Sequence, residues 1–425
     1  MSTAQIIVTS CSRRNLEIEQ LKNFLKGNGY AVLDEDWKVS PAADVILLST
    51  CGFTQAAEDF GFETLRRVQE TKKPGARVIF GGCIPKINPK RVSSEFDGPT
   101  FSPQSYAELG DILGVQHRLE EFRRPNTYAR PSLASTFIGD AQSAIGILKT
   151  FDGSFSGLRY ISQRLGDGAR RRLIQTKYAN LVGQRTFYIQ IQEGCSMHCS
   201  YCVICKAIGP LRSKPVETVL DEFKAGLGSG YKHFQFVGDN AGSYGLDKGT
   251  NMGHLLNRIT AIAGGFDLDL TDIHPVYLPT IFEPVKALCA QHRLSRLYVP
   301  IQSANRRILR LMNRDCDMDR VKRMLIGIKQ AAPPEFKMGT SLIAGFPSET
   351  IHELSDTIRF CQEVGFDWVW CHSFSARPET PASTLPDQIS ADEILRRARW
   401  VKSQLKGKSL VTTAADSMGS KTCQG

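Results

Sequence analysis

The sequence predicts an α/β protein that contains two parallel sheets. Short apolar runs rich in β-branched residues alternate with helical stretches three times before residue 97 and six times after residue 185. Strands of a parallel sheet are buried on both faces and are joined by helical crossovers, which produces this alternation. We therefore expect an N-terminal doubly wound α/β domain followed by an open, partial (βα)6 barrel.

Residues 1–97 contain the first set of alternating elements. Apolar runs at Gln5–Thr9, Asp44–Ser49 and Arg77–Phe80 predict three strands, and helical periodicity covers Asn15–Lys26 and Ala56–Thr71. Because each strand is short and each crossover is helical, these elements predict one small doubly wound domain.

The rest of the chain divides into three parts. Residues 98–185 are rich in Arg, Gly and Ser with broken periodicity, so we expect a linker or insertion there. Residues 186–390 carry the barrel, and residues 391–425 carry one helix and a polar tail. The barrel strands are predicted at Phe187–Gln192, His233–Val237, Asp267–Thr271, Leu297–Ile301, Lys337–Ile343 and Phe366–His372. Active sites of such barrels lie at the carboxyl ends of the strands, so the residues after each strand are the candidates for function.

The composition limits the cellular setting. Of the 425 residues 41% are apolar, no run is long enough for a membrane span, and the N-terminus lacks a signal-peptide pattern, so we expect a cytoplasmic protein with no membrane contact. That compartment keeps thiols reduced, so the twelve cysteines indicate metal ligation or redox chemistry rather than disulfides. The net charge of +10 fits either an RNA partner or an ordinary basic surface.

Three cysteines follow the first predicted barrel strand directly, namely Cys195, Cys199 and Cys202. Three thiolates on one loop hold three irons of a cubane 4Fe–4S cluster and leave the fourth iron open to chelate S-adenosylmethionine, whose reductive cleavage gives a 5′-deoxyadenosyl radical. Cys205 extends the run to the spacing of a ferredoxin, and a zinc site is a further alternative. The strand and helix alternation that follows argues against both, and we interpret Cys205 as a neighbour of the cluster.

The spacing of these cysteines, with Tyr201 before the last, resembles the radical S-adenosylmethionine superfamily. Further segments resemble its methylthiotransferases and occur in the same order. These segments are Ile191–Cys195, Arg212–Pro215, Val237–Asn240, His274–Pro275, Val299–Ser303, Leu311–Arg314, Gly345–Thr350 and Ser375–Thr380. The resemblance implies a radical SAM barrel over residues 186–390.

The resemblance also implies a second 4Fe–4S cluster in the N-terminal domain. Cys11, Cys51 and Cys83 each follow a predicted strand, and the carboxyl ends of parallel strands gather at one edge of the sheet. Each cysteine alone could be a small buried core residue, whereas the three together match the cluster ligands of methylthiotransferases. On this resemblance the second cluster carries the sulfur that a carbon radical of the substrate captures.

Residues after the other barrel strands resemble the family's S-adenosylmethionine site. The resemblance implies that Asp239 accepts a hydrogen bond from the methionine amino group, that Gln302 and Ser303 contact the carboxylate and ribose, and that the backbone of one loop contacts the adenine. The cofactor-binding set is Tyr201, Gly238, Asp239, Gln302, Ser303, Gly345, Phe346 and Pro347. Turn chemistry alone is the alternative for several of these positions.

The chain also departs from the family pattern. We expect it to lack the small C-terminal β-barrel domain that methylthiotransferases usually have, and Ser341 and Glu379 stand where residues common in the family lie near the substrate mouth. The N-terminal cysteine motifs look closest to the branch that modifies an aspartate of a small-subunit ribosomal protein. We therefore expect sulfur or methylthio insertion into a peptide or protein side chain or a small metabolite, with flavodoxin or ferredoxin as reductant. The alternatives are a transfer RNA adenosine as substrate and, in a different class, an electron carrier or RNA-binding module.

Overall fold

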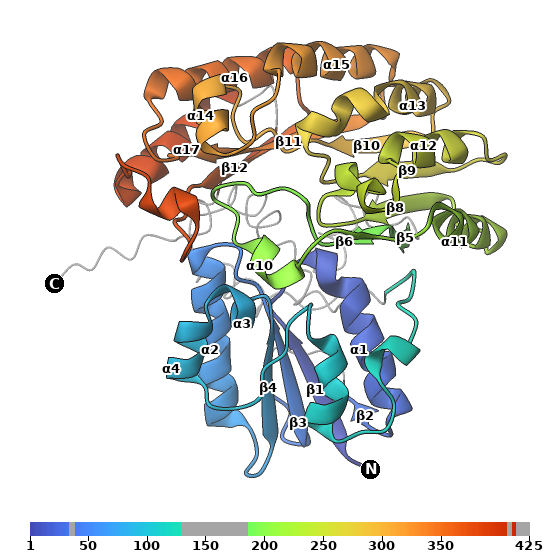
Figure 1. The fold of residues 1–425 in the computed structure, drawn as a ribbon, viewed down its shortest axis with the longest axis vertical. Helices are drawn as coiled ribbons and strands as arrows, with labels where there is room; N and C mark the ends of the chain where they lie inside the picture. The colour runs from blue at the N-terminus through green and yellow to red at the C-terminus, as the bar shows by residue number, and fades with distance from the viewer. Residues whose placement is uncertain (34–38, 129–185, 406–409, 414–425) are drawn as a thin grey trace, which may run out of the picture.

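A computed structural model of the chain describes residues 1–33, 39–128, 186–405 and 410–413. It contains a four-stranded parallel sheet near the N-terminus and a seven-stranded parallel sheet after residue 185 (Figure 1). The N-terminal sheet lies below the larger one in this view, and helix α10 (Ile204–Ile208) lies between them. The two predicted sheets are therefore both present.

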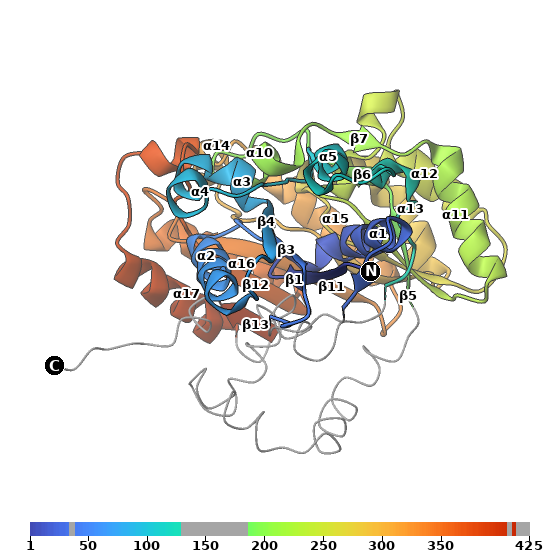
Figure 2. The ribbon, with the colours of Figure 1, turned by 90° about the horizontal axis from the view of Figure 1, so that it is seen from below.

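The N-terminal sheet has the strand order β2-β1-β3-β4. Its strands are β1 (Thr3–Val8), β2 (Ala31–Val32), β3 (Val45–Thr50) and β4 (Arg77–Gly82), and its long helices are α1 (Asn15–Gly27) and α2 (Gln55–Thr71). Successive strand residues face opposite sides, so Leu47 packs against the α1 face while Ile46 and Leu48 pack against the α2 face. Figure 2 shows the two helices on opposite sides of the sheet. This is the doubly wound arrangement that the sequence predicted.

The N-terminal unit extends beyond the expected boundary at residue 97. Phe101, Tyr106, Leu109, Leu113 and Leu119 are buried in the core between the sheet and α1. All of them except Phe101 lie on the short elements η2 (Tyr106–Glu108), α5 (Leu109–Leu113) and η3 (Leu119–Glu121). The prediction of a linker from residue 98 was wrong for this part, because single turns carry apolar residues without the helical periodicity that the prediction relied on. The remainder of the predicted linker, residues 129–185, lies outside the described residues.

The larger sheet has the order β5-β8-β9-β10-β11-β12-β13. The strands are β5 (Thr186–Gln190), β8 (His233–Val237), β9 (Asp267–Leu270), β10 (Leu294–Tyr298), β11 (Lys337–Ala344), β12 (Trp368–Ser373) and β13 (Leu410–Thr413). The helices that cover its outer face are α11 (Val216–Gly228), α12 (Met252–Thr260), α13 (Leu278–Ala290), α14 (Arg306–Leu311), α15 (Met318–Ala331), α16 (Ile351–Val364) and α17 (Ala391–Leu405) (Figure 1). This is the predicted partial barrel with one addition.

The addition is β13, which pairs in parallel with β12 after α17. The sequence predicted only a polar tail there, because a four-residue strand at a sheet edge carries too little pattern to be recognised. Residues 414–425 of that tail lie outside the described residues. In the described part of the chain, no helix has the length and apolarity needed to cross a bilayer.

Side chains join the carboxyl edges of the two sheets. Arg377, after β12, forms an ion pair with Glu58 of α2, and both side chains are almost completely buried. Arg13, after β1, pairs with Asp272, after β9. Helix α3 (Ile84–Ile87) packs against α10. The ends of the strands that carry the predicted functional residues therefore face one another.

Candidate active site

Cys11, Cys51 and Cys83 follow the three neighbouring strands β1, β3 and β4. Burial raises the pKa of the Cys51 thiol to about 12, and the neighbouring Cys11 thiol adds to the rise. Burial also raises the pKa of Cys83, and the Arg14 guanidinium acts against that rise. The three thiols are therefore close enough to influence one another, as the sequence predicted from their shared position after the strands.

A glycine sets the position of Cys83. Gly82 has φ of +89°, and a Cβ atom there would collide with the backbone of Thr50. The Cys83 amide donates to the Thr50 carbonyl oxygen at 2.9 Å. The close approach of β4 to the end of β3 therefore requires glycine and places Cys83 beside the residue that precedes Cys51.

The second set of cysteines lies on the loop after β6 (Gln192–Glu193). The Asn240 amide lies 3.8 Å from the Cys195 sulfur, and Arg314 donates to the Cys199 sulfur at 3.3 Å. The Cys202 amide donates to the Cys199 carbonyl oxygen at 3.0 Å, which closes the loop. Hydrogen bonds and positive charge stabilise thiolate sulfur, so the loop provides the environment that an iron–sulfur cluster needs.

Cys205 lies beside this set. A hydrogen bond with Cys202 lowers the pKa of the Cys205 thiol to about 6 and raises that of Cys202. The Cys205 sulfur also lies 3.5 Å from the Cys202 carbonyl oxygen. The structure therefore places Cys205 next to Cys202, and its interpretation as a neighbour of the cluster stays a prediction.

Several buried polar atoms near the carboxyl edge of the barrel have no hydrogen-bond partner among the described residues. They are the amide of Gln192, Nε2 of His274, Oε1 of Gln302, Nε of Arg314 and Oγ of Ser373. An unsatisfied buried polar atom costs about 1–3 kcal/mol, so the set indicates a polar ligand. S-adenosylmethionine has the amino, carboxylate, hydroxyl and adenine groups to meet such atoms, and the site therefore fits it.

His274 has a defined protonation state. Burial and the nearby Arg314 lower the pKa of the imidazole to about 2, so the ring is neutral. Its Nδ1 accepts a hydrogen bond from the Val276 amide at 3.1 Å, which leaves the proton on Nε2. His274 therefore presents a single N–H donor inside the barrel.

The structure separates the predicted cofactor-binding residues into two groups. Gln302, with φ of +66°, has its amide oxygen buried and unpartnered, and Tyr201 lies beside Arg314 and Cys199. Gly238 packs against the Gln192 side chain. These three positions border the region of unsatisfied polar atoms.

The other predicted side chains have protein partners. Both carboxylate oxygens of Asp239 are engaged, by Arg14 at 2.8 Å and by the Gly194 amide at 2.9 Å. Ser303 is completely buried, and its hydroxyl bonds to Thr357 and to the Asn305 amide. The contacts with S-adenosylmethionine predicted for Asp239 and Ser303 therefore stay predictions, and the structure adds that both side chains also contact protein neighbours.

The loop Gly345–Pro347 is held from inside the protein. Phe346 is fully buried against Phe374, the Gly345 amide donates to Glu349 at 2.8 Å, and the Phe346 carbonyl accepts from the Glu349 amide at 2.9 Å. Burial raises the pKa of Glu349 to about 7. Glu349 therefore fixes the shape of this loop, a role that was not predicted from the sequence.

Other predicted residues lie at the margin of the site. Arg212 pairs with Glu193 at 3.2 Å, and Glu379 pairs with Lys206 of α10 at 2.7 Å. Ser341, expected at the substrate mouth, is buried inside the barrel. No role was predicted from the sequence for Gln192, Asn240 or His274. The available signal was their place at or shortly after the ends of barrel strands.

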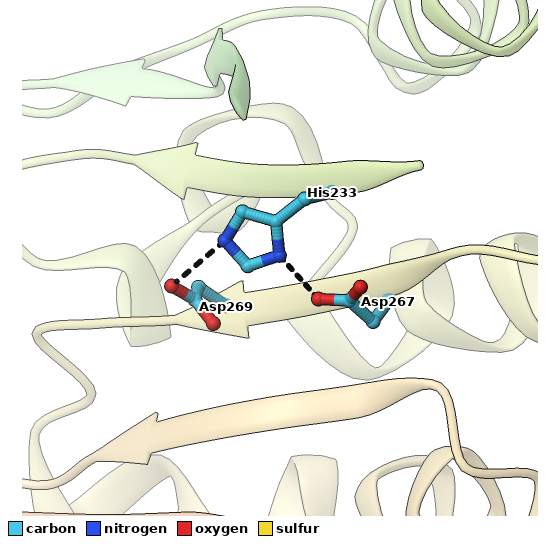
Figure 3. Close-up of side chains that lie close together, drawn as sticks. All are labelled: His233, Asp267 and Asp269. Carbon is cyan, nitrogen blue, oxygen red and sulfur yellow. Dashed lines mark hydrogen bonds and ion pairs between the residues drawn. The ribbon is translucent and has the colours of Figure 1, made fainter. Parts of the chain in front are cut away.

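A buried charged group occupies the opposite end of the barrel strands. His233 opens β8, and its two ring nitrogens face Asp267 and Asp269 of β9 (Figure 3). The hydrogen bonds to these carboxylates outweigh burial and raise the pKa of His233 to about 9. Because the two carboxylates lie against opposite nitrogens, the protonated ring donates to both of them, and an imidazolium has no free lone pair to bind a metal.

Comparison with known proteins agrees with this geometry. The family model of the Radical SAM superfamily matches residues 189–361, and that of Uncharacterized protein family UPF0004 matches residues 3–101. The chain is 28% identical to the ribosomal protein uS12 methylthiotransferase RimO of Roseiflexus sp. (strain RS-1), over 92% of the chain and 78% of the relative. It is 27% identical to the tRNA-2-methylthio-N(6)-dimethylallyladenosine synthase of Idiomarina loihiensis, over 90% of the chain and 72% of the relative.

A solved structure shows the same fold. The radical S-adenosylmethionine methyltransferase TsrM of Kitasatospora setae, with cobalamin and a [4Fe-4S] cluster bound, superposes with a TM-score of 0.55 at 13% identity, over 90% of the chain and 74% of TsrM. Fold and sequence together define a radical S-adenosylmethionine enzyme. The chain belongs to the methylthiotransferase family of these enzymes, and its cofactors are S-adenosylmethionine and 4Fe–4S clusters. The predicted family, fold class and cofactors are confirmed.

Proposed function

We propose that the chain inserts a methylthio group at an unactivated carbon of its substrate and uses two clusters to do so. In this proposal Cys195, Cys199 and Cys202 hold the cluster that binds S-adenosylmethionine, and Cys11, Cys51 and Cys83 hold the second cluster. The observation that carries the proposal is the placement of both cysteine sets on the facing carboxyl edges of the two sheets, where Arg14 contacts Asp239.

The side chains around the first set would prepare the site for its cofactors. When bound, the clusters and S-adenosylmethionine supply the 5′-deoxyadenosyl radical and the sulfur. Arg314 and Asn240 donate toward the Cys199 and Cys195 sulfurs and stabilise their negative charge. The neutral His274 offers its Nε2 proton, and Gln302 offers its amide oxygen, to polar groups of S-adenosylmethionine.

The metal content of the purified chain tests this assignment. Anaerobically reconstituted protein should hold about eight irons, and the triple variant Cys11→Ala/Cys51→Ala/Cys83→Ala should hold about four. The triple variant should still form 5′-deoxyadenosine from S-adenosylmethionine under reduction, whereas Cys199→Ala should not. Cys316→Ala, a half-buried cysteine outside both sets, is the matched control and should keep all the iron. An unchanged iron count in the triple variant contradicts the second cluster.

The proposed substrate is a protein or peptide side chain. Relatives named as ribosomal protein uS12 methylthiotransferases, such as those from Roseiflexus and Chloroflexus aurantiacus, align over at least 90% of the chain and support this class. A reducing protein of the flavodoxin or ferredoxin type would supply the electrons. Mass spectrometry of protein digests from cells with and without the gene should reveal one peptide that loses a methylthio group when the gene is deleted.

Transfer RNA adenosine is the second candidate substrate. Two relatives are named as transfer RNA enzymes, one from Idiomarina loihiensis and one from Xenopus laevis, and the net charge of +10 suits a polyanion. For this substrate, the methylthio difference should appear in digests of RNA, and affinity for transfer RNA should fall steeply with salt. A difference confined to RNA contradicts the protein substrate.

A further inference from the structure

Arg14 joins the two halves of the active site. It stands three residues after Cys11, and its amide donates to the Cys11 carbonyl oxygen at 3.0 Å. Its guanidinium is only 7% exposed and forms an ion pair with Asp239, which follows β8, at 2.8 Å. The first cysteine of the N-terminal set is therefore connected to the barrel through this buried ion pair, next to the more exposed Arg13–Asp272 pair.

Asp239 continues this connection to the other cysteine set. Its second carboxylate oxygen accepts a hydrogen bond from the amide of Gly194 at 2.9 Å. Gly194 immediately precedes Cys195 and has φ of +77°, a conformation that favours glycine. One carboxylate thus holds the start of the Cys195 loop and the guanidinium beside Cys11 at once.

The surroundings of Arg14 fix its orientation. Glu17, which is buried, accepts from one guanidinium nitrogen of Arg14 and from the Tyr106 hydroxyl at 2.8 Å. The Nε atom of Arg14 is buried without a partner among the described residues. Arg14 therefore brings a fixed positive charge to the N-terminal cysteines.

We propose that the Arg14–Asp239 pair is a positioning device that sets the separation of the two clusters, and that the Arg14 charge stabilises electrons on the N-terminal cluster. Radical formation and sulfur transfer take place at different clusters, so their separation decides whether a substrate carbon reaches both. The inference rests on the proposed two-cluster function. In this inference, Asp239 positions the two cysteine loops relative to each other and does not bind S-adenosylmethionine.

Pulsed electron paramagnetic resonance of the reduced holoenzyme tests the separation. The magnetic interaction between the two reduced clusters should give one narrow distance distribution in the wild type and in Arg14→Lys. It should broaden in Asp239→Ala and in Arg14→Gln. Glu58→Gln is the matched control, because it breaks the Glu58–Arg377 pair, which also joins the two units in a buried position but contacts neither cysteine loop. Its distribution should stay narrow.

Two further measurements separate positioning from general stability. Hydrogen exchange of the Gly194 amide should become about tenfold faster in Asp239→Ala, and Asp239→Asn, which keeps an acceptor oxygen, should retain most of the protection. In redox titrations the N-terminal cluster should become harder to reduce in Arg14→Gln and return toward the wild-type potential in Arg14→Lys.

The outcomes distinguish this inference from the proposed function. A wild type that binds only about four irons contradicts the two-cluster function itself. If the wild type binds about eight irons, two results overturn the inference but leave the two-cluster function standing. One is a cluster separation in Asp239→Ala that equals that of the wild type. The other is a change in Glu58→Gln as large as the change in Asp239→Ala. If Asp239→Ala does not bind both clusters, Asp239→Asn is measured in its place. The inference is also overturned if the distance distribution in Asp239→Asn is not broadened and the cluster potential in Arg14→Gln is unchanged.

Discussion

The buried His233 group predicts how stability depends on pH. The imidazole lies between Asp267 and Asp269, and its side chain is only 8% exposed, so solvent screens these ion pairs weakly. Hydrogen bonds to both carboxylates outweigh burial and raise its pKa from 6.5 to about 9. A rise of that size corresponds to about 3 kcal/mol in the free energy of unfolding.

The direction of the effect follows from the raised pKa. The folded state holds the His233 proton more tightly than the unfolded state, so the contribution is fully present below about pH 6.5. It is lost as the pH rises through about 9, where the folded protein releases the proton. The barrel should therefore lose stability on the alkaline side through this group.

Denaturant unfolding of wild type and His233→Gln measures the contribution. The variant should be less stable by about 3 kcal/mol near pH 6, and the difference should shrink to below about 1 kcal/mol near pH 10. His292→Gln is the control, because His292 is exposed and pairs with Glu335 on the surface, and its effect should be small at both pH values. A difference for His233→Gln that stays constant between these pH values refutes the reasoning.

Three other predictions follow from single contacts. Arg377→Met should destabilise the chain by about 2–3 kcal/mol because it removes one of the two arginine partners of the buried Glu58, which keeps Arg91 at 3.0 Å, and adding Glu58→Leu should give a non-additive change in a double-mutant cycle of unfolding free energies. His274→Ala should weaken S-adenosylmethionine binding by about tenfold or more in calorimetry of the reconstituted protein, and unchanged affinity would show that Nε2 faces elsewhere. Gly82→Ala should cost about 1–3 kcal/mol in thermal unfolding and lower the iron content, because the positive φ of Gly82 and its close approach to the Thr50 backbone exclude a side chain. Gly75→Ala is the control, because Gly75 also has a positive φ but no atom lies near its missing Cβ, so its effect should be smaller.

The sequence predicted the strands well because parallel strands carry long apolar runs. The observed β8 coincides with the predicted His233–Val237, and β9 and β11 differ by one residue at one end. The prediction for β10 started three residues late, since Leu294–Arg296 includes the half-buried polar residues Ser295 and Arg296, which interrupt the apolar run. The short strands β2 and β13 and the turns that bury Tyr106 carried no periodicity to detect.

The sequence by itself determined the class of chemistry. Cysteine spacing is a local property, so Cys195, Cys199 and Cys202 indicated an iron–sulfur loop without any knowledge of the fold. The order of strands and helices placed Cys11, Cys51 and Cys83 at one sheet edge, because parallel strands all end on the same side.

Only the tertiary structure decided how the two edges meet. Arg14 and Asp239 are 225 positions apart in the chain, and no pattern along the sequence relates them. The ion pair exists because two separate sheets bring their strand ends together and exclude water between them, and a buried charge requires a partner there. The same packing engaged the side chains of Asp239 and Ser303 with protein partners and left buried atoms of Gln302 and His274 without partners among the described residues. The order of motifs along the chain does not reveal these contacts, because they depend on which separate elements pack together.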